Sequence, residues 1–305
     1  GFNKLNLKKG TPEHKEYGER VKRELTILNE LNFTDYILLV WDVINFCKKN
    51  DIPTGFGRGS AAGSLVLYLI NVTRVDPIKY GLYFERFVSK IRAKSTVVDG
   101  VVYLDGSLVP DVDLDLCYYR RHHVISYIEE KYKNKTSKIL TFNTLSSKLL
   151  IKEVGKIAGE KSETEMTEVT KLIPKDAGIV ADLEDAYKSE KDFKKWCDGN
   201  KFVYDICLKL KDLIKNKGVH PAGQIVSYEE LKDMCPIELS SDKSLVSSYD
   251  MGSVSTFSIK LDLLGLRGVS VVDDVCKAVG IGLMDIDLND PIIYQNLQKL
   301  DSQHG

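Results

Sequence analysis

The most constraining stretch of the sequence is residues 109–116, where apolar and acidic side chains alternate without interruption. Successive side chains of a β-strand point to opposite faces. A strand here therefore carries Asp111, Asp113 and Asp115 on one face and apolar side chains, which can enter a core, on the other. Neighbouring carboxylates repel one another, and a divalent cation would relieve that repulsion because Mg²⁺ prefers oxygen ligands. An edge strand with a solvated acidic face explains the alternation equally well.

A second stretch, residues 255–263, has the same period of two. It places Lys260 and Asp262 on a polar face and apolar side chains on the other. If the two strands pair in one sheet with their acidic faces on the same side, Asp262 joins the carboxylates of the first strand. A metal and a lysine beside carboxylates form a site suited to a phosphate-bearing substrate. The pairing is a hypothesis, because the two stretches lie far apart in the chain.

A glycine-rich run, residues 55–64, precedes an apolar segment that is predicted to be a helix. The glycines allow the backbone to approach a ligand closely, and the N-terminus of the helix favours an anion. Arg58 can add a bidentate phosphate contact. The run lacks the GK[ST] ending of a Walker loop, and its spacing does not fit a dinucleotide fingerprint. A tight glycine-rich connection explains the same residues without a ligand.

Local patterns predict the elements around these stretches. Thr11-Pro12-Glu13 is typical of a helix start, and Asp99-Gly100 between β-branched runs predicts a hairpin. A short strand is expected over residues 224–227. Residues 145–215 are expected to be mostly helical and rich in both lysines and acids, which suits nucleic-acid contact or simply a solvated surface. Further helices are expected over residues 11–31, 35–49, 76–87, 120–132, 270–279 and 292–300.

Composition excludes several classes of protein. A chain of 305 residues suggests two domains, or one large domain with an insertion. The net charge of -1 gives no whole-chain attraction to nucleic acid, so any such binding needs a local basic patch. Six scattered cysteines without a CxxC pair argue against a zinc site or a disulfide scaffold. No apolar run reaches about 18 residues, so no membrane span is expected. The start at Gly1 and the uncapped end at residues 301–305 predict a fragment of a longer protein.

Several short motifs occur together along this chain in a fixed order. They resemble the catalytic core of the bacterial C-family replicative polymerases, the alpha subunits of DNA polymerase III, and the resemblance covers nearly the whole chain. The motifs that carry it are Tyr36–Asp42, Gly57–Ser64, Leu82–Phe87, Pro110–Asp115, Thr141–Thr144, Lys171–Pro174, His220 with Ala222 and Gly223, and Lys260–Leu266.

The resemblance implies an α+β fold. Its main part would be a palm of the polymerase-β-like nucleotidyltransferase type, a mixed sheet with helices, interrupted by a helical thumb. The implied domains are residues 1–144 for the first part of the palm, 145–215 for the thumb, 216–275 for the second part of the palm and 276–305 for the start of the fingers.

The resemblance also implies roles for particular residues. Asp111, Asp113 and Asp262 would hold two catalytic Mg²⁺ ions, for which Mn²⁺ can substitute, and Asp115 is a weaker candidate on the same face. The candidates for binding the triphosphate of the incoming nucleotide are Gly57, Arg58, Gly59, Ser60, Gly63, Ser64, Arg86 and Lys260. Further candidates are Arg92 and His220, although a lone histidine between glycines is as often structural, and Lys148, Lys152 and Lys171 for DNA.

The implied function is template-directed 5′–3′ DNA synthesis, in which a DNA-directed DNA polymerase adds dNTPs to the primer of primer-template DNA. The expected setting is the cytoplasm of a bacterial or phage-infected cell, with other replisome subunits bound through regions outside these residues. Phe56 replaces the usual proline of the family, and Pro221 interrupts its usual His-Ala pair. A long hairpin also separates Arg92 from Pro110. These departures favour a divergent member, such as a phage-encoded one.

Two other functions remain open from the sequence. A template-independent nucleotidyltransferase could use the same palm, and dependence of incorporation on template sequence would separate it from a replicase. A non-catalytic DNA-binding or assembly module would need a partner chain for activity. The three intact aspartates argue against a decayed site, but the incomplete fingers leave this alternative in place.

Overall fold

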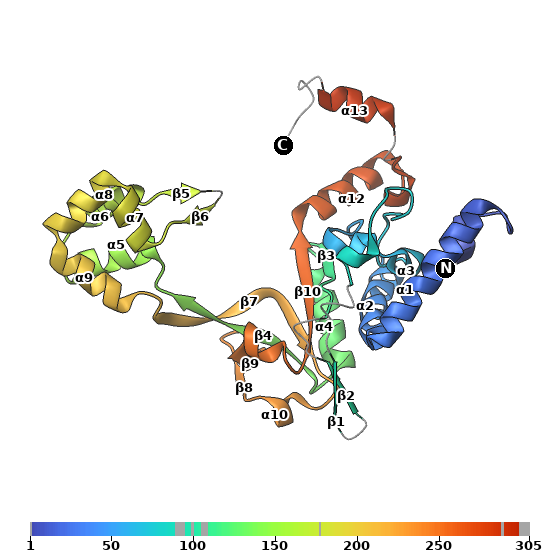
Figure 1. Ribbon diagram of the computed structural model, residues 1–305, viewed down its shortest axis with the longest axis horizontal. Helices are drawn as coiled ribbons and strands as arrows, with labels where there is room; N and C mark the ends of the chain where they lie inside the picture. The colour runs from blue at the N-terminus through green and yellow to red at the C-terminus, as the bar shows by residue number, and fades with distance from the viewer. Residues whose placement is uncertain are drawn as a thin grey trace. The chain divides into compact units, whose positions relative to one another are not determined.

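The computed structural model describes residues 2–88, 95–98, 101–104, 109–176, 178–287 and 290–298. It confirms an α+β fold with a mixed sheet, whose six strands follow the order β3-β10-β7-β4-β9-β8 (Figure 1). The chain forms two compact units, which we call unit 1 (residues 1–139 and 221–305) and unit 2 (residues 140–220). None of the described helices combines the length and hydropathy needed to cross a bilayer.

The two acid-bearing strands are neighbours in the sheet, which confirms the hypothesis that they pair. β10 pairs with β3 in parallel, with Asp262 opposite Asp113 and Leu263 opposite Leu114. On its other side β10 pairs with β7 in antiparallel orientation. The strands of the sheet are β3 (Asp113–Cys117), β10 (Ile259–Leu266), β7 (Ile214–Val226), β4 (Thr136–Thr144), β9 (Leu245–Asp250) and β8 (Ile237–Leu239).

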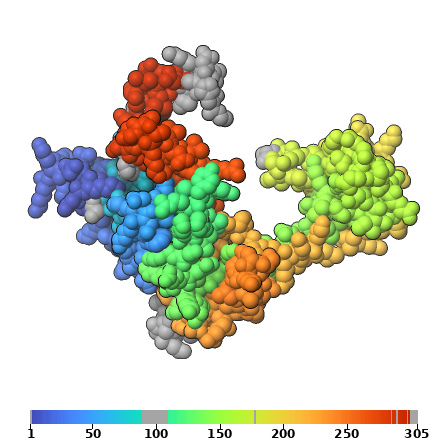
Figure 2. Space-filling model, turned by 180° about the vertical axis from the view of Figure 1, so that it is seen from behind, coloured from blue at the N-terminus to red at the C-terminus, as the bar shows by residue number. Residues whose placement is uncertain are grey.

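The apolar faces of β3 and β10 form one core with the helices behind them. Leu114 and Leu263 are buried in a cluster that also contains Val40 and Val43 of α2 and Ile128 of α4. The space-filling view shows the light-blue region that includes α2 beside the green region that includes α4 (Figure 2). Because alternate residues of a strand face opposite ways, burying this face leaves the aspartates on the other.

The helices of unit 1 begin and end close to the predicted positions, with one exception. Thr11 caps α1 by accepting a hydrogen bond from the backbone N–H of His14 at 3.2 Å. The helices are α1 (Pro12–Glu30), α2 (Thr34–Lys49), α3 (Leu65–Leu69), α4 (Arg121–Lys131), α10 (Leu231–Met234), α11 (Met251–Val254), α12 (Arg267–Val279) and α13 (Pro291–Gln298), with 3-10 turns at Phe2–Leu5, Gly59–Gly63, Phe84–Arg86 and Leu283–Asp285.

The exception is the helix expected over residues 76–87, and that prediction is wrong. The Asp76 carboxylate accepts hydrogen bonds from the backbone N–H groups of Ile78 and Lys79, which closes a turn at the expected helix start. Gly81 then has a φ of +61°, outside the helical region. Only the short 3-10 turn at Phe84–Arg86 follows.

Two expected strand features also need comment. The strand predicted over residues 224–227 is longer than expected, because β7 already begins at Ile214. Its first half is largely exposed and has no apolar alternation, so its sequence gives no strand signal. The predicted hairpin is confirmed as β1 (Ser95–Val98) paired with β2 (Val101–Leu104). Its turn, Asp99-Gly100, lies outside the described residues.

Unit 2 has its own core and is mostly helical, as expected for this part of the chain. Leu150, Met166, Phe193 and Cys207 are buried together in it. Its elements are α5 (Ser147–Ile157), α6 (Glu163–Lys171), α7 (Leu183–Ser189), α8 (Lys191–Gly199) and α9 (Lys201–Leu210), with a small hairpin of β5 (Lys175–Asp176) and β6 (Ile179–Val180).

Candidate metal centre

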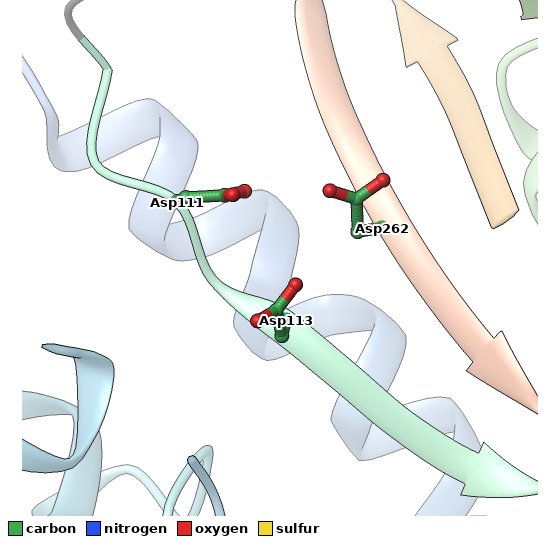
Figure 3. A group of neighbouring side chains, drawn as sticks. All are labelled: Asp111, Asp113 and Asp262. Atoms are coloured by element: carbon green, nitrogen blue, oxygen red, sulfur yellow. The ribbon is translucent and has the colours of Figure 1, made fainter. Parts of the chain in front are cut away.

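Three carboxylates converge where β3 and β10 run side by side. Asp113 and Asp262 lie opposite each other in the parallel pair, and Asp111 lies two residues before Asp113. Their side chains point toward one another (Figure 3), and one oxygen from each lies within 4.8 Å of the others. This confirms the predicted geometry, in which Asp262 shares a sheet and a face with the first strand.

One oxygen of the Asp262 carboxylate lacks a hydrogen-bond partner among the described residues. Asp262 is 7% exposed, and its Oδ1 atom is buried without a hydrogen-bond partner among the described residues. A buried polar atom without a partner costs free energy, so native structures normally supply one. Three carboxylates whose oxygens approach one another, one of them on a residue with a buried unsatisfied oxygen, fit a hard divalent cation such as Mg²⁺.

Two basic side chains lie beside the acids. Lys260 Nζ is 2.5 Å from Asp262 Oδ2, on the same face of β10 as predicted. Arg58 Nη2 is 3.2 Å from Asp113 Oδ2. Partial burial raises the pKa of Asp111; the charge of Lys260 opposes this rise, whereas Asp262 and Asp113 add to it. The three acids thus remain mutually repulsive despite the two cations, which favours a divalent ion among them.

The acidic strand is held by a hydrogen bond from its backbone to Tyr36, a residue that had no predicted role in the site. Tyr36 of α2 is buried, and its hydroxyl accepts a hydrogen bond from the backbone N–H of Val112 at 3.1 Å. Val112 lies between Asp111 and Asp113, so this bond sets the path of the backbone that carries both acids. Burial raises the pKa of Tyr36, which keeps its hydroxyl neutral.

The glycine-rich run borders the acidic face. The backbone N–H of Gly55 donates to the carbonyl of Asp115 at 2.8 Å. A Cβ at Gly55 would lie 2.7 Å from the Cβ of Asp115, so only glycine fits this close approach. Gly57 has a φ of +97°, which also favours glycine. Arg58 then reaches both Asp113 and Asp115.

The predicted anion site at the N-terminus of α3 is wrong, because the protein fills that position itself. Glu24 of α1 is fully buried. Its carboxylate accepts hydrogen bonds from Ser64 Oγ at 2.9 Å and from the backbone N–H groups of Leu65 and Val66 at 3.1 and 3.0 Å. Arg20 pairs with it at 2.5 Å. The Ser64 hydroxyl and the first amides of α3 are therefore engaged by Glu24, and they do not lie open to a phosphate.

Gly63 has a structural role as well. A Cβ at this position would lie 2.6 Å from the carbonyl oxygen of Tyr83, so glycine allows the two backbone segments to pack together. The candidates Gly59 and Ser60 lie in the 3-10 turn that connects Arg58 to Gly63. Arg58 is thus the side chain by which this run reaches the acids.

The remaining candidates lie on other parts of the chain, and their roles are not tested by the geometry of the acids. Arg86 is exposed at the end of its 3-10 turn, and His220 is half-buried on β7. Arg92 lies outside the described residues. In unit 2, Lys152 pairs with Glu163, Lys171 pairs with Glu168, and Lys148 has no ion-pair partner in the described part of the chain. The roles of these residues stay predictions.

The protein also has a hollow whose lining is distinct from the three clustered aspartates. It has a volume of about 450 Å³ and lies between α2, α4 and the paired ends of β7 and β10. Leu38, Trp41, Tyr132 and Tyr228 contribute to its lining, which includes none of the three clustered aspartates. The chemistry of the carboxylates is therefore distinct from this apolar space.

Comparison with known proteins gives one consistent family. A family model described as the bacterial DNA polymerase III alpha NTPase domain matches residues 2–265. The DNA polymerase III subunit alpha of Helicobacter pylori strain J99 is 33% identical over 312 residues, which cover 95% of this chain and 24% of the relative. The same subunit of Ureaplasma parvum is 36% identical over 294 residues, which cover 94% of this chain and 29% of the relative. The chain thus spans about a quarter of the length of these curated relatives.

Proposed function

The chain belongs to the family of bacterial DNA polymerase III alpha subunits, and we propose that it performs template-directed transfer of nucleotides from dNTPs to a primer 3′-hydroxyl. The observation that carries this proposal is the convergence of Asp111, Asp113 and Asp262 from two paired strands. A cluster of carboxylates of this kind is what two-metal phosphoryl transfer requires. The chain spans only part of its relatives, so the proposal includes that these residues are active without the rest of such a protein.

Asp111, Asp113 and Asp262 would hold two Mg²⁺ ions, or Mn²⁺ in their place. When bound, such ions activate the attacking hydroxyl and stabilise charge on the transferred phosphate and its leaving group. Lys260 supports this role, because its ammonium beside Asp262 can offset phosphate charge. Arg58 supports it from the glycine-rich run, where its guanidinium can donate to a phosphate. Arg86 would also bind the triphosphate of the nucleotide, and Arg92 and His220 are further candidate residues of the site.

For the architecture, we propose that the mixed sheet of unit 1 is a palm of the polymerase-β-like type. The parallel pairing of β3 with β10 supports this, since it brings acids from two distant segments to one face. Residues 145–215 would be the thumb, and residues from 276 onward would begin the fingers. The DNA would be a primer-template, and other replisome subunits would bind parts of the relatives that this chain does not span.

Incorporation should follow the template. We expect the 305-residue chain, given primer-template DNA with Mg²⁺ or Mn²⁺ and one dNTP at a time, to add only the nucleotide complementary to the template base. Extension of labelled primer on a gel measures this. Addition of all four nucleotides regardless of template would instead indicate a template-independent transferase. DNA binding without any extension would favour the non-catalytic module.

DNA binding through unit 2 should depend on salt, because phosphate contacts release counterions. Lys148→Ala is expected to weaken primer-template binding for all sequences alike and to lower the salt slope by about one. Lys171→Ala is the matched control. It should have a smaller effect, because Glu168 already lies 2.6 Å from the Lys171 ammonium. Fluorescence anisotropy across a salt series measures both slopes. Binding that does not change with salt would indicate that these lysines belong to an ordinary solvated helical surface.

A further inference from the structure

Arg58 lies between two aspartates with different environments. Its Nη2 is 3.2 Å from Asp113 Oδ2, and its Nε is 3.4 Å from Asp115 Oδ1. The side chain of Asp113 is 29% exposed, whereas that of Asp115 is 11% exposed. Asp113 belongs to the cluster of carboxylates that converge within 4.8 Å, and among the described residues Asp115 does not. The same guanidinium thus connects a candidate metal ligand with a carboxylate outside that cluster.

Asp115 is fixed by the glycine-rich run. Its carbonyl accepts the N–H of Gly55, and its side chain packs against the Cα of Gly55 so closely that no Cβ would fit. Thr54, the preceding residue, forms a β-bridge with Leu116. Oδ1 of Asp115 is buried and lacks a hydrogen bond among the described residues, so Arg58 is its ionic partner. Asp115 therefore joins the strand of the acids to the segment that carries Arg58.

Arg58 and a divalent ion would compete for the carboxylate of Asp113. A guanidinium and a metal ion are both cations, and they repel each other when they share one carboxylate. An ion that enters the cluster would therefore weaken the pair between Arg58 and Asp113. Without a second anchor, the exposed and flexible Arg58 side chain would be free to leave. The pair with Asp115 gives it a position beside the metal centre that does not depend on Asp113.

We propose that Asp115 is a positioning residue that anchors Arg58 beside the metal centre. Without metal, Arg58 pairs with Asp113 as well as with Asp115. Once metal binds, Arg58 keeps its pair with Asp115 and is free to donate to a phosphate. The phosphate part of this inference rests on the proposed function, and the competition between Arg58 and metal does not. It assigns Asp115 a role distinct from metal binding, although it shares a face with the three clustered aspartates.

The competition is tested by Mn²⁺ titration calorimetry on the wild-type chain, Arg58→Gln, Asp115→Asn and the double variant. Arg58→Gln should bind Mn²⁺ roughly threefold or more tightly, because it removes a competing cation. Asp115→Asn should weaken Mn²⁺ binding, because an ion that displaces Arg58 from Asp113 then leaves the guanidinium without an anionic partner. This loss of affinity should be about threefold or more smaller when Arg58 is already absent. An equal loss in both backgrounds would mean that Asp115 acts on the metal directly, and the proposal would be wrong. Unchanged or weaker binding by Arg58→Gln would also overturn it.

The affinity for dATP tests the positioning role, because the two explanations predict opposite changes. If only charge mattered, removing the negative charge of Asp115 would tighten the binding of the anionic dATP. We expect Asp115→Asn to weaken dATP binding at saturating Mn²⁺ instead, and to have little further effect in the Arg58→Gln background. Tighter or unchanged binding would overturn the positioning role. If the wild-type chain binds Mn²⁺ but no dATP, the proposed function fails while the calorimetric cycle still decides the role of Asp115. Thermal unfolding of each variant confirms that it is folded.

Discussion

Asparagine in place of Asp113 or Asp262 is expected to abolish divalent-ion binding and to lower nucleotide incorporation by at least about a thousandfold. Asparagine keeps the shape of the side chain but removes the charge that a metal requires. Even the loss of an outer partner of a metal ligand lowers metal affinity by about 10–100-fold. Metal ions contribute several kcal/mol to phosphoryl transfer, and each roughly 1.4 kcal/mol is a factor of ten in rate. Mn²⁺ calorimetry and primer extension measure the two effects.

Folding should survive these two changes. Each change removes repulsion between carboxylates in the metal-free chain but also an ion pair, with Arg58 or Lys260. Because the two effects oppose each other, the free energy of unfolding should change little. Asp205→Asn is the matched control, because it makes the same chemical change at an exposed position on α9. It should leave Mn²⁺ affinity and extension unchanged. If both Asp113→Asn and Asp262→Asn bound Mn²⁺ as tightly as the wild type, the assignment of the metal centre would have to be abandoned.

Glu24→Ala is expected to destabilise the protein by about 3–5 kcal/mol, the range for breaking a buried charge pair. The change removes the acceptor for Ser64 Oγ and for the first backbone N–H groups of α3. It also leaves Arg20, whose Nη2 otherwise donates to the carbonyls of Gly63 and Leu82, without its carboxylate. Unsatisfied donors and an unpaired guanidinium then remain at the junction of α1 and α3. Urea denaturation followed by circular dichroism measures the change.

A second glutamate on the same helix provides the control for that experiment. Glu19 is 71% exposed and lies 3.9 Å from Lys15, so Glu19→Ala should cost less than about 1 kcal/mol, as exposed ion pairs do. Glu24→Gln should be intermediate, because its amide oxygen can still accept one of the bonds. Equal stability of Glu19→Ala and Glu24→Ala would show that the buried carboxylate does not hold α3 in place.

Local periodicity determined the faces of the two acidic strands. Alternation in residues 109–116 assigned the aspartates and the apolar residues to opposite sides, and the burial of Leu114 and Leu116 agrees with it. The same reasoning placed Lys260 and Asp262 on one face of β10. These predictions succeeded because the direction of a side chain in a strand depends only on the backbone of its immediate neighbours. The helix start predicted at Thr11-Pro12-Glu13 succeeded for the same reason.

Other features depended on which distant segments meet. In its own helix Glu24 reads as one more charged residue, and only the docking of α3 buries it and makes it the internal anion of that helix. Tyr36 had no predicted role in the site, and only the packing of α2 against the acidic strand brings its hydroxyl to the backbone of Val112. The helix expected over residues 76–87 gave way to a turn closed by Asp76. Arg58 forms ion pairs with Asp113 and Asp115, which no spacing in the sequence predicts.

The sequence by itself therefore determined the family, the α+β class and the faces on which the acids lie. Tertiary structure decided which charges are neutralised internally and which remain for a ligand. The physical reason is that the direction of a side chain is a local property of the backbone, whereas the burial and pairing of a charge depend on every segment that packs around it. Glu24 and Asp262 are both buried acids, but the first has its donors within the fold and the second retains an oxygen without a hydrogen bond among the described residues.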